Sequence, residues 1–351
     1  LEKYMLEVIY PRSTGHVLMG VDYGPIGKNP SGYNYIDGTA EYINIKGGPH
    51  RTTKFNEDKD RTSNLEFGGP NGTTLEFFLN KSELIDVVTQ SDKMAIFDLT
   101  NGVPVANSSS ADYGRMRVSL VSGSETQFFV TMLSGTNGFL ETPVPSTPDQ
   151  ITISDGKWRN FSFVFNTDQQ PPVIDFYVNG TCIETGITAS AAVDIDGTNL
   201  IGQVTGTMIG NIGALRTAPD TFGDVDPAIS EGDGKLTGSI DEFRFWKKAR
   251  NAEQIGRHWF TNVNGGSDKY DANVSLGVYF PFNEGITLTS SIDKVILDYS
   301  GRISNGNFVG YTAAARSTSS AINELEIQYI SERGDPIVRT SNPFYISLKS
   351  Q

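Results

Sequence analysis

The chain has 351 residues, which is enough for one large β domain with an appendage or for two modest domains. Its formal net charge of −13 argues against nucleic acid and anionic membranes as main partners, because both repel an acidic surface. The single cysteine, Cys182, excludes an intrachain disulfide and with it the small secreted modules that disulfides stabilise.

Glycine is frequent, with 37 residues, and the chain is rich in Ser, Thr, Asn and Asp. This composition predicts many tight turns between short strands, which is typical of an all-β protein. The sequence contains no run of 18 apolar residues, and it opens at Leu1 without a charged and then apolar leader. We expect the chain to be a processed or partial piece of a longer polypeptide.

Apolar and polar residues alternate in short segments from the start of the chain, which predicts β-strands. The first five segments are Ala40–Ile45, Thr74–Leu79, Lys93–Leu99, Arg115–Val121 and Thr126–Leu133. A sixth, Gly156–Asn166, contains Phe161, Phe163 and Phe165 at a period of two, so these rings should share one face of the strand.

The next segment, Val173–Gly186, predicts a hairpin. Two β-rich runs flank Asn179-Gly180. This dipeptide suits a type I′ turn, in which both central residues take positive φ.

The stretch "KLTGSIDEFRFWKKARNAEQIGRHWF", Lys235 to Phe260, predicts a long strand that leads into a short helix. Ile240, Phe243 and Phe245 should face the core, with a slip in register between the first two. Asn251 can cap the helix, with Gln254 three residues later as in a capping box. Asp241 is expected at the wet edge of the strand.

The adjacent carboxylates Asp241 and Glu242 are candidates for acid/base chemistry. On a regular strand, however, neighbouring residues face opposite sides and cannot form a working pair. The chain contains no Glu-x-Asp-x-Glu array of the kind that retaining hydrolases use, no Gly-x-Ser-x-Gly elbow and no zinc spacing. Enzymatic activity is therefore not expected.

Four segments in order resemble the laminin-G-like, concanavalin-A-like jelly-roll superfamily over Tyr33 to Phe260. They are "YIDGTAEYINI", "DGKWRNFSFVFN", "IDFYVNGTCIETG" and "GKLTGSIDEFRFWKKARNAEQIG". The resemblance implies an antiparallel jelly-roll sandwich with a short helix after the last long strand. The expected organisation is an N-terminal extension (1–32), a jelly roll (33–262), accessory strands (263–312) and an extended C-terminal tail (313–351).

The later block "LGVYFPFNEGI…VILDYSGRISNGNFVGYT" and the tail "RGDPIVRTSNP" resemble large structural proteins of tailed, T4-like marine bacteriophages. This resemblance implies a non-enzymatic virion protein that acts as a fibre, decoration or host-surface adhesion element. Its partners would be other virion subunits and a host-surface glycan. The alternatives are a carbohydrate-binding or adhesin module of a bacterial surface protein and, third, a glycoside hydrolase.

The superfamily resemblance also implies a cofactor, Ca²⁺, held by the side chains of Asp37 and Asp241 together with backbone carbonyls. The alternative is that Asp241 hydrogen-bonds a neighbouring turn and that Glu242 pairs with Arg244 or a lysine. For glycan stacking, Trp158, Trp246 and Trp259 are more simply explained as core residues, and Tyr113 and Tyr33 are weaker candidates. Cys182 is expected to be a small buried residue.

Overall fold

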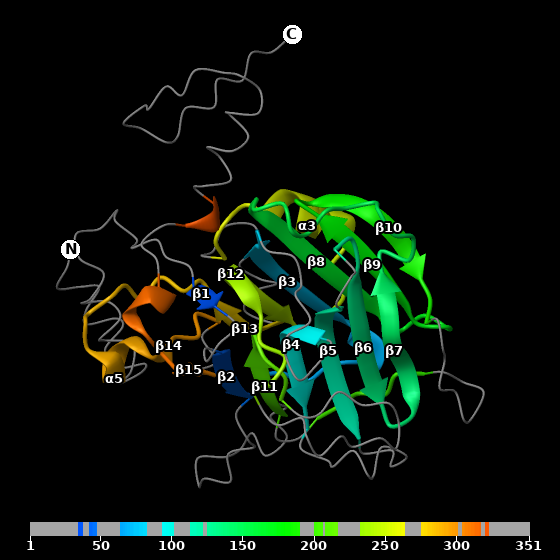
Figure 1. Cartoon of the computed structure of the whole chain (residues 1–351). Coiled ribbons are helices and arrows are strands. Elements are labelled where there is room, and N and C mark those ends of the chain that lie inside the picture. The colour runs from blue at the N-terminus through cyan, green and yellow to red at the C-terminus, as the bar shows by residue number, and fades with distance from the viewer. Residues whose placement is uncertain are drawn as a thin grey trace, which may run out of the picture.

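The fold is a sandwich of two antiparallel sheets, as predicted (Figure 1). The computed structural model describes residues 34–37, 42–47, 64–82, 93–101, 113–121, 125–189, 200–205, 208–216, 232–263, 275–300, 304–316 and 320–322. The predicted extension at 1–32 lies outside these residues, as does most of the predicted tail at 313–351. No helix in this part of the chain is long and apolar enough to cross a membrane.

Among the described residues, sheet A has seven strands, in the order β1-β12-β3-β8-β9-β10, with β13 also paired to β12. The strands are β1 (Asn34–Asp37), β12 (Thr237–Trp246), β3 (Thr73–Asn80), β8 (Arg159–Asn166), β9 (Val173–Val178), β10 (Thr181–Ile187) and β13 (Leu276–Phe280). β1 pairs with the first half of β12 and β13 with its second half.

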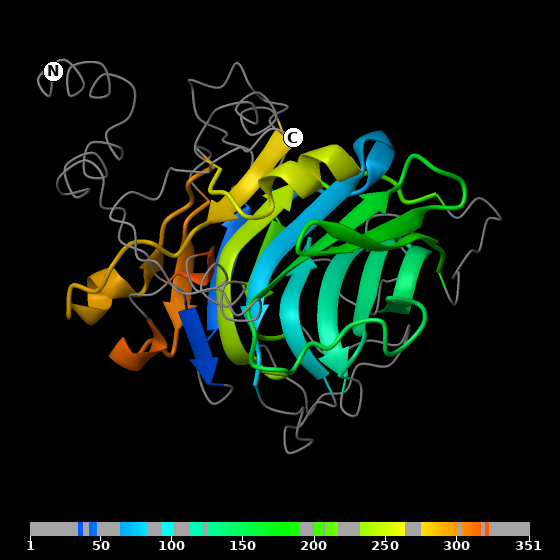
Figure 2. The same ribbon diagram turned by 90° about the horizontal axis from the view of Figure 1, so that it is seen from above.

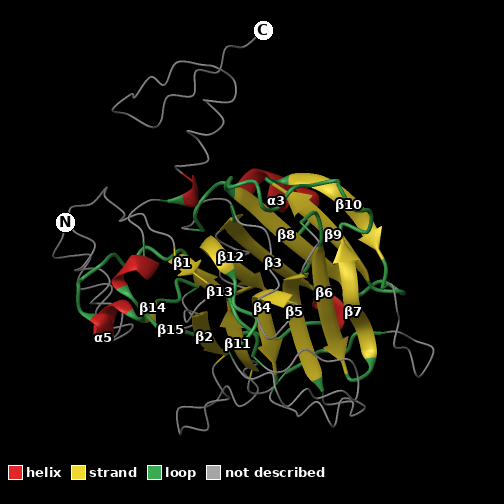
Figure 3. Ribbon diagram, viewed as in Figure 1, coloured by secondary structure: helices red, strands yellow, loops and turns green. Residues whose placement is uncertain are grey.

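Sheet B has eight strands in the part of the chain that the structure describes, in the order β14-β15-β2-β11-β4-β5-β6-β7. The strands are β14 (Val295–Ile296), β15 (Gly306–Val309), β2 (Tyr42–Gly47), β11 (Met208–Ile212), β4 (Lys93–Thr100), β5 (Gly114–Val121), β6 (Phe128–Ser134) and β7 (Asn137–Val144). Figure 3 shows how little helix accompanies these strands.

The core lies between the sheets and is rich in phenylalanine. Phe161, Phe163 and Phe165 on β8 are fully buried on one face, which confirms the period-two prediction. Phe128 of sheet B packs edge-on against Phe161 and Phe163, with ring centroids 4.9 and 5.3 Å apart. Edge-to-face pairs of this kind add to the stabilisation that burial alone provides.

Both local predictions in the second half of the chain are confirmed. Asn179 and Gly180 have φ of 49° and 72°, as a type I′ turn between β9 and β10 requires. The helix is α3 (Ala252–His258), with a complete capping box between Asn251 and Gln254. Its Ile255 packs on Val164 and Tyr177, so α3 covers the outer face of sheet A (Figure 2).

The accessory strands predicted within 263–312 are part of the sandwich. β13 extends sheet A through β12, and β15 extends sheet B through β2. Phe280 and Phe308 on these strands belong to the main core. The other helices named among the described residues are single turns: η1 (Gly69–Asn71), α5 (Ser290–Asp293) and η4 (Ala313–Ala315).

Candidate functional site

Asp241 and Glu242 lie on the same side of sheet A, because β12 has a β-bulge at this point. In the register with β3, Asp241 is opposite Phe78 and Arg244 is opposite Glu76. Two residues of β12, Glu242 and Phe243, therefore face one residue of β3, Phe77. Glu242 takes a φ of 51°. The bulge is the predicted slip in register, and it returns Phe243 to the core. The prediction that the two carboxylates face opposite sides is therefore wrong.

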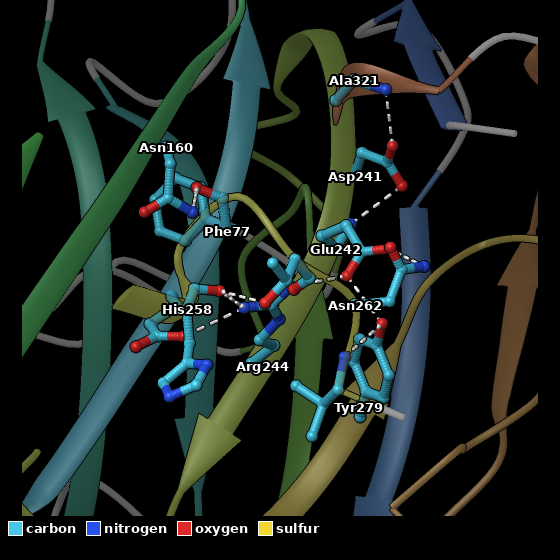
Figure 4. A network of polar contacts seen from close by, with 12 residues as sticks. Phe77, Asn160, Asp241, Glu242, Arg244, His258, Asn262, Tyr279 and Ala321 are labelled. Carbon is cyan, nitrogen blue, oxygen red and sulfur yellow. Dashed lines mark hydrogen bonds and ion pairs between the residues drawn. The ribbon is translucent and has the colours of Figure 1, made fainter. Parts of the chain in front are cut away.

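Both carboxylates are buried and their oxygens already have donors (Figure 4). Asp241 is 1% exposed, so the prediction of a wet edge is also wrong. Its Oδ1 accepts from the Glu242 amide at 2.8 Å and its Oδ2 from the Ala321 amide at 2.9 Å. The first of these contacts fits the alternative in which Asp241 satisfies neighbouring backbone.

Glu242 is held by three side chains, which come from β12 itself, from β13 and from the segment after α3. Its Oε2 accepts from Arg244 at 2.8 Å and from the Tyr279 hydroxyl at 2.7 Å, and its Oε1 accepts from Asn262 at 3.2 Å. The pairing of Glu242 with Arg244, one of the two predicted alternatives, is confirmed. Arg244 also donates to the carbonyls of His258, the last residue of α3, and of Thr261 beyond it.

A third carboxylate, Glu76 of β3, lies next to this pair. Glu76 Oε1 accepts from Arg250 at 2.9 Å, and its Oε2 lies 3.6 Å from Arg244 Nη1. Trp246 Nε1 donates to the same Oε2 at 3.3 Å, and the Arg250 guanidinium lies 4.0 Å from the centre of the Trp246 ring. Glu76, Arg244 and Arg250 are all fully buried.

Burial sets the protonation of this network. Burial and then the Glu242 charge raise the pKa of Asp241 well above its ordinary value. Burial also raises the pKa of Glu242, although Arg244 and Tyr279 act to lower it. Three carboxylates, Glu76, Asp241 and Glu242, thus lie near the two guanidinium groups of Arg244 and Arg250.

This network is structural in character. Arginines, amides and a tyrosine occupy its carboxylate oxygens, and the residues after α3 together with Ala321 cover it. A hydrolytic pair needs space between the carboxylates for a sugar and a water molecule. The exposures of 0–2% leave no such space at Glu76, Asp241 and Glu242.

Asp37 and Asp241 are not opposite each other across β1 and β12. Asp37 pairs with Thr237, four residues from Asp241, which is about 13 Å along a strand. Both carboxylate oxygens of Asp241 accept backbone amide hydrogens. Within the described residues, no three His, Cys, Asp or Glu side chains form a metal-binding group. Ca²⁺ binding through Asp37 and Asp241 stays a prediction.

Most of the aromatic residues considered for glycan stacking are buried. Trp158 and Trp246 are 3% and 0% exposed, and Tyr113 is 2% exposed. Trp259 is half-buried and packs over Phe78. Phe260, which is 47% exposed, lies edge-on to Trp259 with the two ring centroids 5.5 Å apart. Tyr33 lies outside the described residues.

Cys182 does not follow its prediction. Its thiol is exposed on the edge strand β10, so the expectation of a small buried residue is wrong. The cause is the position of the strand, because no further described strand follows β10 in sheet A.

A second set of polar side chains forms a row across six strands on the outer face of sheet B. Each member is opposite the next in the strand register. This polar row consists of Asn307, Asn44, Asn211, Asp98, Arg117 and Thr131. Sequence reasoning missed it, because each strand contributes one residue and only the register aligns them.

The middle of the polar row is buried although it faces away from the core. Asn211 and Asp98 are 0% exposed and Arg117 is 1% exposed. Asn44 donates to Asn211 at 2.8 Å. Asp98 accepts two hydrogen bonds from Arg115, at 3.1 and 2.8 Å, and one from the Arg216 amide at 2.8 Å.

Glu141 of β7 continues the row beyond Thr131. Its carboxylate accepts from Arg117 and Thr131 and lies 2.8 Å from Lys93 Nζ. Burial acts to raise the pKa of Glu141, but the charges of Arg117 and Lys93 outweigh it and lower that pKa to about 2. Burial and then the Arg117 charge lower the pKa of Lys93.

Residues 61–256 match the Laminin_G_3 family, described as the Concanavalin A-like lectin/glucanases superfamily, over more than half of the chain. The chain belongs to this family. The superfamily includes both lectins and glucanases, so membership leaves binding and hydrolysis open. None of the comparisons bears on the resemblance to phage structural proteins, which stays a prediction.

Several solved structures are similar to this member of the superfamily. A candidate carbohydrate-binding protein from Bacteroides ovatus is 16% identical with a TM-score of 0.44, covering 83% of this chain and 61% of that one. The heptameric SAP-like pentraxin of Limulus polyphemus is 11% identical with a TM-score of 0.38, covering 68% of this chain and 86% of that one. Among curated proteins, none matches this chain.

Proposed function

We propose that this chain is a non-catalytic recognition module, a lectin-like jelly roll that binds glycans without cleaving them. One observation carries the proposal. The carboxylates of β3 and β12 that share one face of sheet A are buried and held by arginines and amides. The superfamily includes lectins and glucanases, and this observation favours glycan binding over glycan hydrolysis for this chain.

Two assays on the full chain test this proposal together. A glycan array should give a saturable signal, while laminarin and agar-type polysaccharides should release no reducing ends. Turnover of either polysaccharide would contradict the proposal. If turnover persisted in Asp241→Asn and Glu242→Gln, the reacting groups would lie elsewhere in the chain.

We further propose that the module is displayed on a tailed-phage particle, as a fibre, decoration or adhesion element among other virion subunits. The support is the sequence resemblance of 276–312, whose strands β13, β14 and β15 join both sheets. Many weak glycan sites on one particle would act together, which raises the overall avidity.

Quantitative mass spectrometry of purified particles tests this location. Many copies per particle are expected. Recovery of the chain in a bacterial surface fraction, with none in particles, would replace this proposal with the adhesin alternative and leave glycan recognition in place.

A further inference from the structure

The strand β14 ends sheet B, so one of its edges has no strand beside it among the described residues (Figure 1). Its inner edge pairs with β15, where the Phe308 amide donates to the Lys294 carbonyl at 2.6 Å. Backbone groups of an antiparallel strand point to its two edges in alternation, so those of Val295 and Leu297 point to the outer edge. An outer edge of this kind is a template on which another strand can pair.

Two charged side chains occupy the outer edge of β14. Arg316 Nη2 donates to the carbonyls of Asp293 and Val295, at 2.9 and 3.1 Å. Glu284 Oε1 accepts from the Leu297 amide at 2.8 Å. An ion pair of 2.7 Å between Arg316 Nη1 and Glu284 Oε2 joins the two side chains. A side-chain donor and a side-chain acceptor thus lie where a neighbouring strand would place its own N–H and C=O groups.

This ion pair is largely shielded from solvent. The side chains of Arg316 and Glu284 are 2% and 10% exposed, and they come from positions 32 residues apart in the chain. A buried ion pair often adds little net stability, because both charges lose their water. Stability alone is therefore a weak reason for placing this pair at a sheet edge.

The turn that leads into β14 makes an open edge more prone to association. Leu288 and Ile292 in this turn are 85% and 58% exposed. Exposed apolar side chains next to open backbone groups favour contact with another chain. A second copy of this chain suits such a contact, because two identical strands can pair antiparallel about a two-fold axis and are then self-complementary.

We propose that Glu284 and Arg316 guard the outer edge of β14 and thereby keep it from pairing with β14 of a second copy of this chain. This inference concerns self-association and is independent of the proposed glycan binding. Without the two side chains, the carbonyls of Asp293 and Val295 and the amide of Leu297 would be open to the backbone of the other copy.

Sedimentation velocity of the full chain over a range of concentrations tests the guard. In Glu284→Ala the Leu297 amide loses its acceptor and Arg316 loses its anion, so we expect self-association at a concentration about tenfold lower than in wild type. The control is Glu284→Gln, which keeps an oxygen for that amide and should associate no more than wild type. Wild-type behaviour of Glu284→Ala, with its near-UV circular dichroism intact, would overturn the proposal.

A second substitution shows whether the association runs through β14. In the Glu284→Ala background, Leu297→Pro removes the open N–H and should abolish the added association, whereas Leu297→Ala should retain it. Association that persists with Leu297→Pro would overturn the proposal, because it would not use this edge.

Glu284→Asp replaces Glu284→Ala if the alanine variant does not fold. Its shorter side chain withdraws the carboxylate from the Leu297 amide but keeps a negative charge for Arg316. We expect it to associate more strongly than wild type, and association equal to that of wild type would overturn the proposal.

Discussion

Arg244 is the residue on which the sheet A network depends. It contacts two buried carboxylates, Glu242 and Glu76, and the carbonyls of His258 and Thr261. It thereby ties β12 to the segment that leaves α3. Removal of one member of a buried ion pair leaves its partner charged and without compensation, which costs far more than the loss of a surface pair.

Arg244→Met should therefore lower the free energy of unfolding by about 3–5 kcal/mol, because Glu242 would lose its cation. Urea unfolding followed by tryptophan fluorescence measures the change. The control is Arg257→Ala, which breaks an exposed i,i+4 pair with Glu253 and should cost about 0.3–0.5 kcal/mol. Equal effects of the two variants would show that the network does not depend on this ion pair.

The raised pKa of Asp241 predicts a decline in stability with rising pH. Its folded-state pKa lies above the unfolded value, so the folded state binds the proton more tightly. The contribution is fully present below about pH 4 and is lost as the pH rises towards the folded pKa. Asp241→Asn should lack this decline, and parallel profiles of wild type and variant between pH 4 and 8 would contradict the prediction.

Glu141 should change stability with pH in the direction opposite to Asp241, because its pKa is lowered. Its pKa is lowered to about 2, so its contribution to stability is present above the unfolded value and is lost as the pH falls towards 2. Glu141→Gln should be less stable than wild type at pH 7 and should converge with it near pH 2. The control is Glu253→Gln, at a position 63% exposed, which should cost only about 0.3–0.5 kcal/mol from its surface pair with Arg257.

At the scale of the element, the sequence was informative wherever a local rule acts alone. Alternation marked six strands, and the Asn179-Gly180 and Asn251–Gln254 signals predicted a turn and a capped helix correctly. β7 was missed because its pattern is broken at Glu141, which takes a φ of 48°, and β11 was also missed. The slip in β12 was visible in the sequence, but its consequence for the orientation of Glu242 was not.

The β9–β10 hairpin permits a test with a matched control. Gly180 and Gly186 have nearly equal φ, of 72° and 71°. A Cβ at Gly180 would collide with the Trp259 indole, whereas one at Gly186 would meet nothing within 4 Å. Gly186→Ala should cost about 1–2 kcal/mol from backbone strain alone.

Gly180→Ala should cost about 1–3 kcal/mol more than Gly186→Ala, because Trp259 must move from its place over Phe78. Unfolding in urea measures both costs, and the tryptophan emission of the folded state should change only for Gly180→Ala. Equal costs and unchanged emission would mean that the indole does not rest on the turn.

At the scale of the whole molecule, sequence resemblance gave the correct sandwich, but it did not reveal how the sheets are completed or where polar residues gather. β13 and β15 come after α3 in the chain, yet each pairs with a strand of the main sandwich. The polar row is equally non-local, because residues from 44 to 307 meet only through register. Such features depend on which strands become neighbours, and local patterns do not encode that.

A chain that ends at residue 262 should therefore fail to fold cooperatively. It would lack core residues such as Val278, Phe280 and Phe308. Each contributes about 1.5–3 kcal/mol when buried, against a typical total of about 5–15 kcal/mol. Near-UV circular dichroism and dye binding, compared with the full chain, would detect the loss. A sharp unfolding transition in the short chain would contradict this expectation.

The exposed position of Cys182 on β10 has a practical consequence. It is the single cysteine of the sequence, so a maleimide reagent attaches to one known place without any engineered change. Burial and then the Asp175 charge raise the pKa of this thiol, so coupling should quicken in mildly alkaline buffer. A fluorophore or gold cluster carried there would test the proposed display on a phage particle, because the label would be counted on purified particles.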